Sequence, residues 1–164
     1  MASGDTLLVF LPANNVPPSS DYATFDTRNG HLVLDFRPDT ANESAIFPGV
    51  MPRSYSGGGL TVYIHYAMST ATTGDIDWDV SFERIGDQQQ DIDSDGFAAA
   101  NSVDNTTVPG TSGNVDIVSV AFTDGADMDS IAVGEAFRMK ITRDGISDTA
   151  TGDAELLRVE IKET

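Results

Sequence analysis

Apolar and polar residues alternate along several short segments of this chain, which is the pattern of β-strands that bury one face. In segment 75–85, DIDWDVSFERI, every second residue from Ile76 to Phe82 is apolar and most of the residues between them are aspartates. The same alternation recurs in EAFRMKITRD (135–144) and AELLRVEIKE (154–163). Shorter apolar runs predict further strands at 5–12, 30–36, 43–49, 59–69 and 114–124.

Turn-rich segments separate these strands, and helical periodicity is limited to a short turn at 126–131. About eight short strands without a covering helix predict an all-β protein, an antiparallel β-sandwich of the jelly-roll type. Residues 21–164 are expected to form this domain, and residues 1–20 are expected to be its first strand or an extended, proline-containing arm. The longest connection, 84–114, has the length of a functional loop or of one that holds an element of its own.

Segment 75–85 also predicts where individual side chains lie. Trp78 is on its apolar face, so we expect it in the core. Asp75, Asp77 and Asp79 stand in a row on the other face, and a row of like charges is expected to keep this strand from pairing at its edge. His65 is out of phase with its apolar neighbours and should point away from them. The tyrosines, Tyr22, Tyr55, Tyr63 and Tyr66, are expected at the surface.

The composition narrows the classes of partner. Twenty-six acidic against nine basic residues give a net charge of −17, which repels nucleic-acid phosphates and anionic membranes, so we expect neither partner. The longest apolar run near the start is too short for a signal sequence or a membrane span. Five of the nine basic residues lie in the last 27 positions, where they form either a docking edge for an acidic partner or ordinary solvated strand faces.

One motif suggests a metal. Asp91, Asp93, Asp95 and Gly96 have the D-x-D-x-D-G spacing that begins a calcium loop. A full EF-hand would need an acid at its twelfth position, which is Ser102, and flanking helices that the sequence does not predict. A looser calcium site at the three aspartates and an ordinary exposed turn both remain open.

Catalytic signatures are not found in the sequence. The chain has no cysteine, and its two histidines, His31 and His65, fall in separate predicted strands without a nucleophile elbow. Acidic residues are so abundant that a pair of carboxylates is uninformative for glycoside hydrolysis. We therefore expect a protein that is not an enzyme and that uses no cofactor, apart from the open question of calcium.

Three segments resemble a known group of proteins. They are SGGGLTVYIHYAMSTATTGDIDWDVSFERI (56–85), DSDGFAAANSVDNTTVPGTSGNVDIVSVAF (93–122) and SDTATGDAELLRVEIKE (147–163). Together they are similar to parts of small all-β proteins from tailed-phage structural gene clusters, which include jelly-roll head decoration (cement) proteins. The resemblance covers about two thirds of the chain and includes no catalytic motif.

This resemblance implies a structural virion protein on the outer surface of the phage head. Such a protein is expected to assemble as a homotrimer and to stabilise contacts between subunits of the major capsid protein. The alternative is a carbohydrate- or receptor-binding module of a phage tail fibre or appendage, in which calcium could assist binding. A glycan-active enzyme is a third, weaker alternative.

Overall fold

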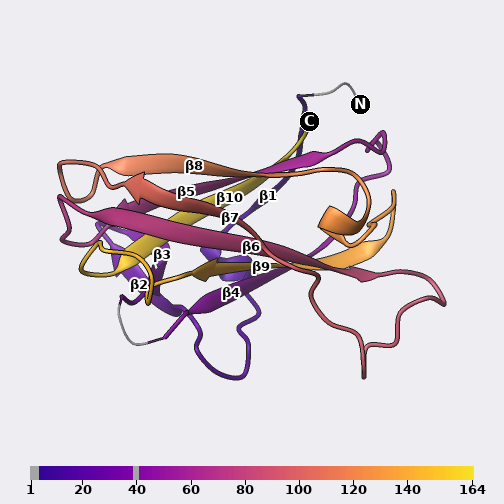
Figure 1. Ribbon diagram of the computed structural model, residues 1–164, viewed down its shortest axis with the longest axis horizontal. Coiled ribbons are helices and arrows are strands. Elements are labelled where there is room, and N and C mark those ends of the chain that lie inside the picture. Colours follow the sequence, from indigo (N-terminus) through magenta and orange to yellow (C-terminus); the bar gives the residue numbers. More distant parts are fainter. Residues whose placement is uncertain (1–3, 39–40) are drawn as a thin grey trace.

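The computed structural model describes residues 4–38 and 41–164, and these form two facing β-sheets (Figure 1). The strands are β1 (Thr6–Phe10), β2 (Thr24–Arg28), β3 (His31–Phe36), β4 (Ser44–Val50), β5 (Leu60–Met68), β6 (Asp75–Ile85), β7 (Asn101–Thr107), β8 (Val115–Phe122), β9 (Ala136–Arg143) and β10 (Ala154–Glu163). Two 3-10 turns, η1 (Pro12–Asn14) and η2 (Ala126–Met128), are the helical elements among the described residues. No helix in these ranges is long and apolar enough to cross a membrane.

The strands form two antiparallel sheets. Sheet A has the order β2-β3-β10-β5-β8, with β1 pairing to β10 beside β3. Sheet B has the order β4-β9-β6-β7. The predicted antiparallel β-sandwich of the jelly-roll type is confirmed, and most predicted strand boundaries agree with the structure within one or two residues.

The core lies between the sheets, where the apolar positions of the alternating strands meet. Trp78 is fully buried, as predicted, and the rings of Phe36 and Tyr66 meet it edge-on at centroid distances of 5.1 and 5.5 Å. Two of the tyrosines expected at the surface, Tyr55 and Tyr66, are instead buried. The reason is that their hydroxyl groups find acceptors in the fold, the Gly58 carbonyl oxygen for Tyr55 and a carboxylate 3.0 Å away for Tyr66.

Two strands, β2 and β7, were not predicted. The polar strand β7 lies inside the long connection 84–114 and pairs with β6. The aspartates of β6 support this pairing, because Asp77 accepts the Asn105 amide at 2.6 Å and Asp79 accepts the Ser102 hydroxyl at 2.5 Å. The expectation that the aspartate row prevents edge pairing is therefore wrong.

The five basic residues near the C-terminus do not form one docking edge. Arg138 and Lys140 lie on sheet B against the ring of Phe97, at 4.9 and 4.7 Å from its centroid. Arg143 is buried between the sheets, and the remaining two belong to β10 in sheet A. Phe97 comes from the connection between β6 and β7, so this loop folds back over sheet B.

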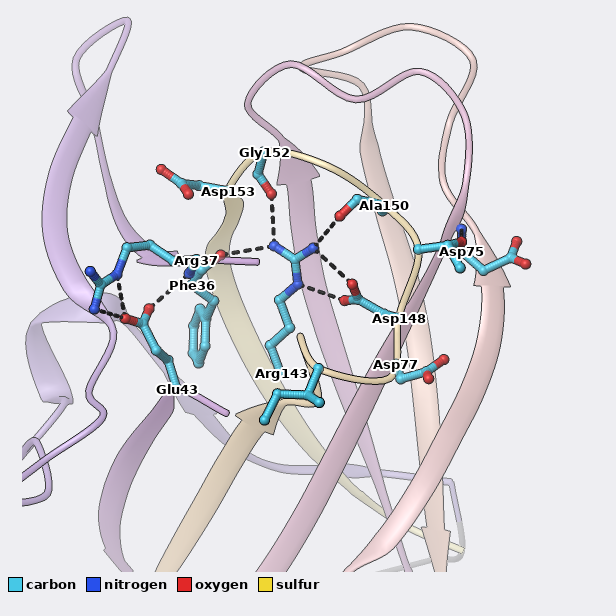
Figure 2. Close-up of polar contacts among 12 residues, drawn as sticks. Phe36, Arg37, Glu43, Asp75, Asp77, Arg143, Asp148, Ala150, Gly152 and Asp153 are labelled. Atoms are coloured by element: carbon cyan, nitrogen blue, oxygen red, sulfur yellow. Dashed lines mark hydrogen bonds and ion pairs between the residues drawn. The ribbon is translucent and has the colours of Figure 1, made fainter. Parts of the chain in front are cut away.

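Arg143 is the most extensively bonded side chain of the core (Figure 2). It is 0% exposed, yet its guanidinium donates five hydrogen bonds. Nε and Nη2 donate to the Asp148 carboxylate at 2.7 and 3.2 Å. Nη1 donates to the carbonyl oxygens of Phe36 and Gly152 at 2.9 and 2.8 Å, and Nη2 donates to that of Ala150 at 2.6 Å.

This network joins the two sheets. Arg143 ends β9 of sheet B, Phe36 ends β3 of sheet A, and Gly152 lies just before β10. Burial raises the pKa of Asp148, and the neighbouring guanidinium opposes that rise. Five donors matched to five contacts leave no unpaired N–H on the buried charge, which is the condition under which a buried ion pair is tolerated.

We predict that Arg143→Lys lowers the free energy of unfolding by about 3 kcal/mol, because lysine keeps the charge but has three donors in place of five. Urea denaturation followed by tryptophan fluorescence measures this change. The matched control is Arg158→Lys, since Arg158 is exposed and bonds only to the neighbouring Leu157 carbonyl oxygen, and it should change stability by less than about 0.5 kcal/mol. Equal losses in the two variants would contradict the role given to Arg143.

Candidate functional site

A hollow of about 360 Å³ lies on the outer face of sheet A, and we call it the sheet A hollow. Its apolar lining is Val33, Ala67, Val115 and Leu157. Its polar lining is Arg28, Asn29, His31 and Glu155, with Gly113 beside them. The lining residues of β3, β5 and β10 alternate with members of the core cluster such as Leu34 and Leu156, and they lie outside that cluster. Val33 and Ala67 are almost fully buried, so the accessible apolar side chains of the hollow are Val115 and Leu157.

A β-bulge in β10 turns Leu157 into the hollow. The pairing of β10 with β5 shifts between Leu156 and Arg158, so Leu157 is an extra residue on its strand. Leu156 is fully buried in the core and Arg158 is exposed, and Leu157 between them lines the hollow. Bulges commonly redirect a side chain next to a binding site.

The hairpin between β2 and β3 brings the polar residues to the hollow. Asn29 and Gly30 have φ angles of 47° and 81°, the positive values that a two-residue type I′ turn requires at both positions. The turn pairs Arg28 directly with His31. The Asn-Gly dipeptide is also the sequence signal that could have predicted β2, because it is typical of such hairpins.

Arg28 is held in a fixed orientation at one side of the hollow. Its Nη1 group donates to the Met68 carbonyl oxygen at 2.9 Å and pairs with the Glu155 carboxylate. Gly113 makes room for it, since a Cβ atom there would lie 2.9 Å from Nη2, and its φ of +84° also favours glycine. The hydrogen bonds of Arg28 to other described residues all use Nη1, and its side chain is 36% exposed, so the guanidinium keeps donors that face solvent or a ligand.

Carboxyl groups crowd the outer face of sheet A beside the hollow. Asp35 lies directly opposite Glu155 in the pairing of β3 with β10, and its Oδ1 is buried without a hydrogen-bond partner. Burial, followed by the charges of Asp26, Glu155 and Asp153, raises the pKa of Asp35 to about 7. The local field on this face is therefore strongly negative near neutral pH.

We predict that Asp35→Asn stabilises the protein at pH 8 by on the order of 1 kcal/mol, a value reduced from the full pKa shift because water still reaches Asp35. The folded-state pKa of about 7 lies above the unfolded value of 3.8, so Asp35 contributes stability at low pH that is lost as the pH rises between these values. The stability difference between variant and wild type should thus grow from pH 4 to pH 7 and then level off.

Urea denaturation at pH 4, 6 and 8 measures this difference. Asp104→Asn is a matched control, because Asp104 is an exposed acid on β7 and its replacement changes the net charge by the same amount. The crowding of carboxyl groups at Asp35 would be contradicted if the stability difference between Asp35→Asn and the wild type did not depend on pH. It would also be contradicted if Asp104→Asn changed the stability with the same pH dependence.

The aspartates of the predicted calcium motif lie elsewhere, in the exposed loop between β6 and β7 of sheet B. The Asp91 carbonyl oxygen accepts the amides of Ser94 and Asp95 at 2.9 and 2.8 Å, and the Asp91 carboxylate accepts the Asp93 amide at 3.0 Å. Asp91 thus stabilises a turn of its own loop. Within the described ranges no three acidic, histidine or cysteine residues are grouped so that they could hold a metal ion.

The calcium site at Asp91, Asp93 and Asp95 stays a prediction, and it has a direct measurement. A site there requires the melting temperature to rise in millimolar calcium, because a ligand that binds the folded state stabilises it. Asp93→Ala should remove the rise, since it removes a side-chain ligand but leaves the turn bonds of Asp91, which use the Asp93 backbone amide, in place. A melting temperature that is unchanged by calcium would rule the site out.

Two further hollows are less suited to a ligand. One, of about 390 Å³, is lined by the loops after β4 and β8, but its aromatic residue, Tyr55, is buried and bonded to Gly58, and burial raises the pKa of Tyr55 to about 12. The other, of about 450 Å³, is a shallow surface beside Tyr22, where Arg37 already pairs with the buried Glu43. The sheet A hollow differs from these in that a guanidinium, held in place by Glu155 and the Met68 carbonyl oxygen, lies beside its apolar side chains.

Comparison with known proteins gives the class of fold. No protein-family model matches the sequence, and no curated protein matches it. Solved structures do match. A family 35 carbohydrate-binding module from an environmental isolate has a TM-score of 0.57 at 12% identity, covering 96% of this chain and 94% of the module. The C-terminal CBM6 of LamC, a marine laminarinase from Zobellia galactanivorans, has a TM-score of 0.54 at 13% identity over 97% of this chain and 100% of the module.

A xylan-binding module, CBM15, is also similar, with a TM-score of 0.52 at 10% identity over 96% of this chain and 97% of the module. At these identities the similarity concerns the fold, so this chain has the β-sandwich fold of carbohydrate-binding modules. Nothing in the comparisons indicates a phage protein. Head decoration, the homotrimer, the major capsid protein as partner and the virion location stay predictions from the sequence resemblance.

Proposed function

We propose that this chain is a non-catalytic carbohydrate-binding domain and that the sheet A hollow holds a sugar unit. The observation that carries the proposal is the composition of the hollow, in which four apolar side chains lie beside oriented hydrogen-bonding groups. Small-molecule sites typically have this composition, with apolar groups supplying contact area and a few polar groups supplying specificity. The fold shared with carbohydrate-binding modules supports the same proposal.

A sugar ring matches this lining chemically. Its C–H groups form an apolar face that can pack against the accessible side chains of Val115 and Leu157, while its hydroxyl groups both donate and accept hydrogen bonds. Arg28 offers donors through Nε and Nη2, and Glu155 offers carboxylate oxygens. Each hydroxyl that leaves water can therefore find a partner, which is the condition for burying a polar ligand at low cost.

The acidic residues of the hollow support binding rather than cleavage. Glycoside hydrolases place two carboxyl groups on either side of the bond that they break. Among the described residues, Glu155 is the one acid that lines the hollow, and it is paired with Arg28. A carboxyl group whose oxygen is already paired with a guanidinium is poorly placed to donate a proton to a leaving group.

We predict that the protein binds soluble xylan, laminarin or cello-oligosaccharides, and that Leu157→Asp weakens this binding at least about tenfold, because a charged group replaces apolar contact area in the hollow. Isothermal titration calorimetry with each glycan measures the affinity. Ile92→Asp is the matched control, since Ile92 is an exposed apolar residue on the loop of sheet B and its replacement should leave the affinity unchanged.

The melting temperature of both variants must stay close to that of the wild type for the comparison to hold. Binding of no glycan in a broad neutral and acidic panel would overturn the proposed function. Glycan binding that Leu157→Asp leaves intact would show that the site lies outside the sheet A hollow.

A further inference from the structure

We infer that Glu155 makes the sheet A hollow selective for neutral sugars and excludes acidic ones. This inference rests on the proposed function and assigns the class of glycan to the same site. It depends on the charges that line the hollow and on the bonds that Arg28 already makes.

Arg28 on its own would favour an acidic ligand. A guanidinium binds a carboxylate through two parallel hydrogen bonds, and this pairing is among the strongest that proteins use. Arg28 is the one Lys or Arg side chain in the hollow, and the side chain is 36% exposed, so a ligand can reach it. Uronic acids, which are sugars that carry a carboxylate, would be the natural ligands of such a group.

Glu155 changes this preference because its carboxylate is already paired with the Arg28 guanidinium. The Glu155 side chain is 9% exposed and pairs with Nη1, so the protein itself supplies the carboxylate that a uronic acid would otherwise bring. The Met68 carbonyl oxygen accepts a second bond from Nη1. The positive charge is neutralised while Nε and Nη2 still have N–H groups for uncharged acceptors.

The surroundings add negative charge, and among the described lining residues Arg28 is joined by one other basic side chain, the imidazole of His31. Asp35 lies opposite Glu155, and Asp26 and Asp153 are close enough to act on it electrostatically. A ligand carboxylate at Arg28 would meet the Glu155 carboxylate as a like charge, with the carboxyl groups around Asp35 next to Glu155. A neutral sugar meets no such repulsion, and its hydroxyl groups can accept from Arg28 and donate to Glu155.

The test compares xylohexaose, a neutral glycan, with trigalacturonate, an acidic one, by calorimetry on the full chain in 150 mM salt. The wild type should bind xylohexaose, or another neutral glycan from the panel above, and bind trigalacturonate at least about tenfold more weakly. Glu155→Gln should raise the ratio of the trigalacturonate affinity to the xylohexaose affinity at least about tenfold, because it removes the carboxylate that pairs with Arg28 and repels a ligand carboxylate.

Glu160→Gln is the matched control. Glu160 also lies on β10, pairs with Tyr63 across the strand and is outside the hollow, so its replacement changes the net charge equally without touching the site. It should leave the ratio of the two affinities unchanged. Adding Arg28→Met to Glu155→Gln should abolish the gain in acidic binding.

The outcomes separate the two proposals. The inferred selectivity would be overturned if the wild type bound neutral and acidic glycans equally, or if Glu155→Gln left the ratio of the two affinities unchanged. Either result would leave the proposed carbohydrate binding intact. An equal change in Glu160→Gln would attribute the effect to net charge and also overturn the role of Glu155. Wild type that binds neither class would overturn the proposed function itself.

Discussion

The buried guanidinium of Arg143 is the interaction on which the geometry of this protein depends. It ties the end of β9 to the end of β3, through the Phe36 carbonyl oxygen, and to the segment that leads into β10, through Gly152. The residues that follow this segment, Glu155 and Leu157, line the sheet A hollow. A charge that is buried for structural reasons therefore also positions the strands that build the candidate site.

The hollow itself is produced by local departures from regular strand geometry. The bulge in β10 redirects Leu157, the Asn29–Gly30 turn sets Arg28 beside His31, and Gly113 leaves the space that Arg28 occupies. Each departure lies within or next to a strand that packs one face in the core, namely β10, β3 or β8. Packing in the core thus keeps this surface rigid, and a few outward side chains determine its chemistry. A rigid surface of this kind suits a preformed binding site.

Alternation of apolar and polar residues was sufficient to predict most of the fold, because a strand packed on one face must show that period. It failed for β7, whose sequence NSVDNTT is polar and is held by the carboxylates of β6 rather than by burial. Tyr66 was also misplaced, although it lies in phase with Ile64, a position that the same period assigns to the core.

The candidate site could not be predicted from the sequence, for a different reason. Arg28 and Glu155 are separated by 127 positions, and the pairing of β2 with β3 and of β3 with β10 brings them together. The bulge that exposes Leu157 depends on the pairing partner and not on the local sequence. The calcium motif, by contrast, was visible in the sequence but lies on the loop of sheet B, away from the hollow.

The most direct test of the account is a nuclear magnetic resonance titration of the isotopically labelled protein with xylohexaose or another glycan that it binds. Carbohydrate binding in the sheet A hollow predicts that amide shifts change in residues 28–33, 113–117 and 155–158 and change little in the loops around Tyr55 and Asp91. Shifts confined to those loops, with the residues of the hollow unaffected, would contradict the assignment of the site.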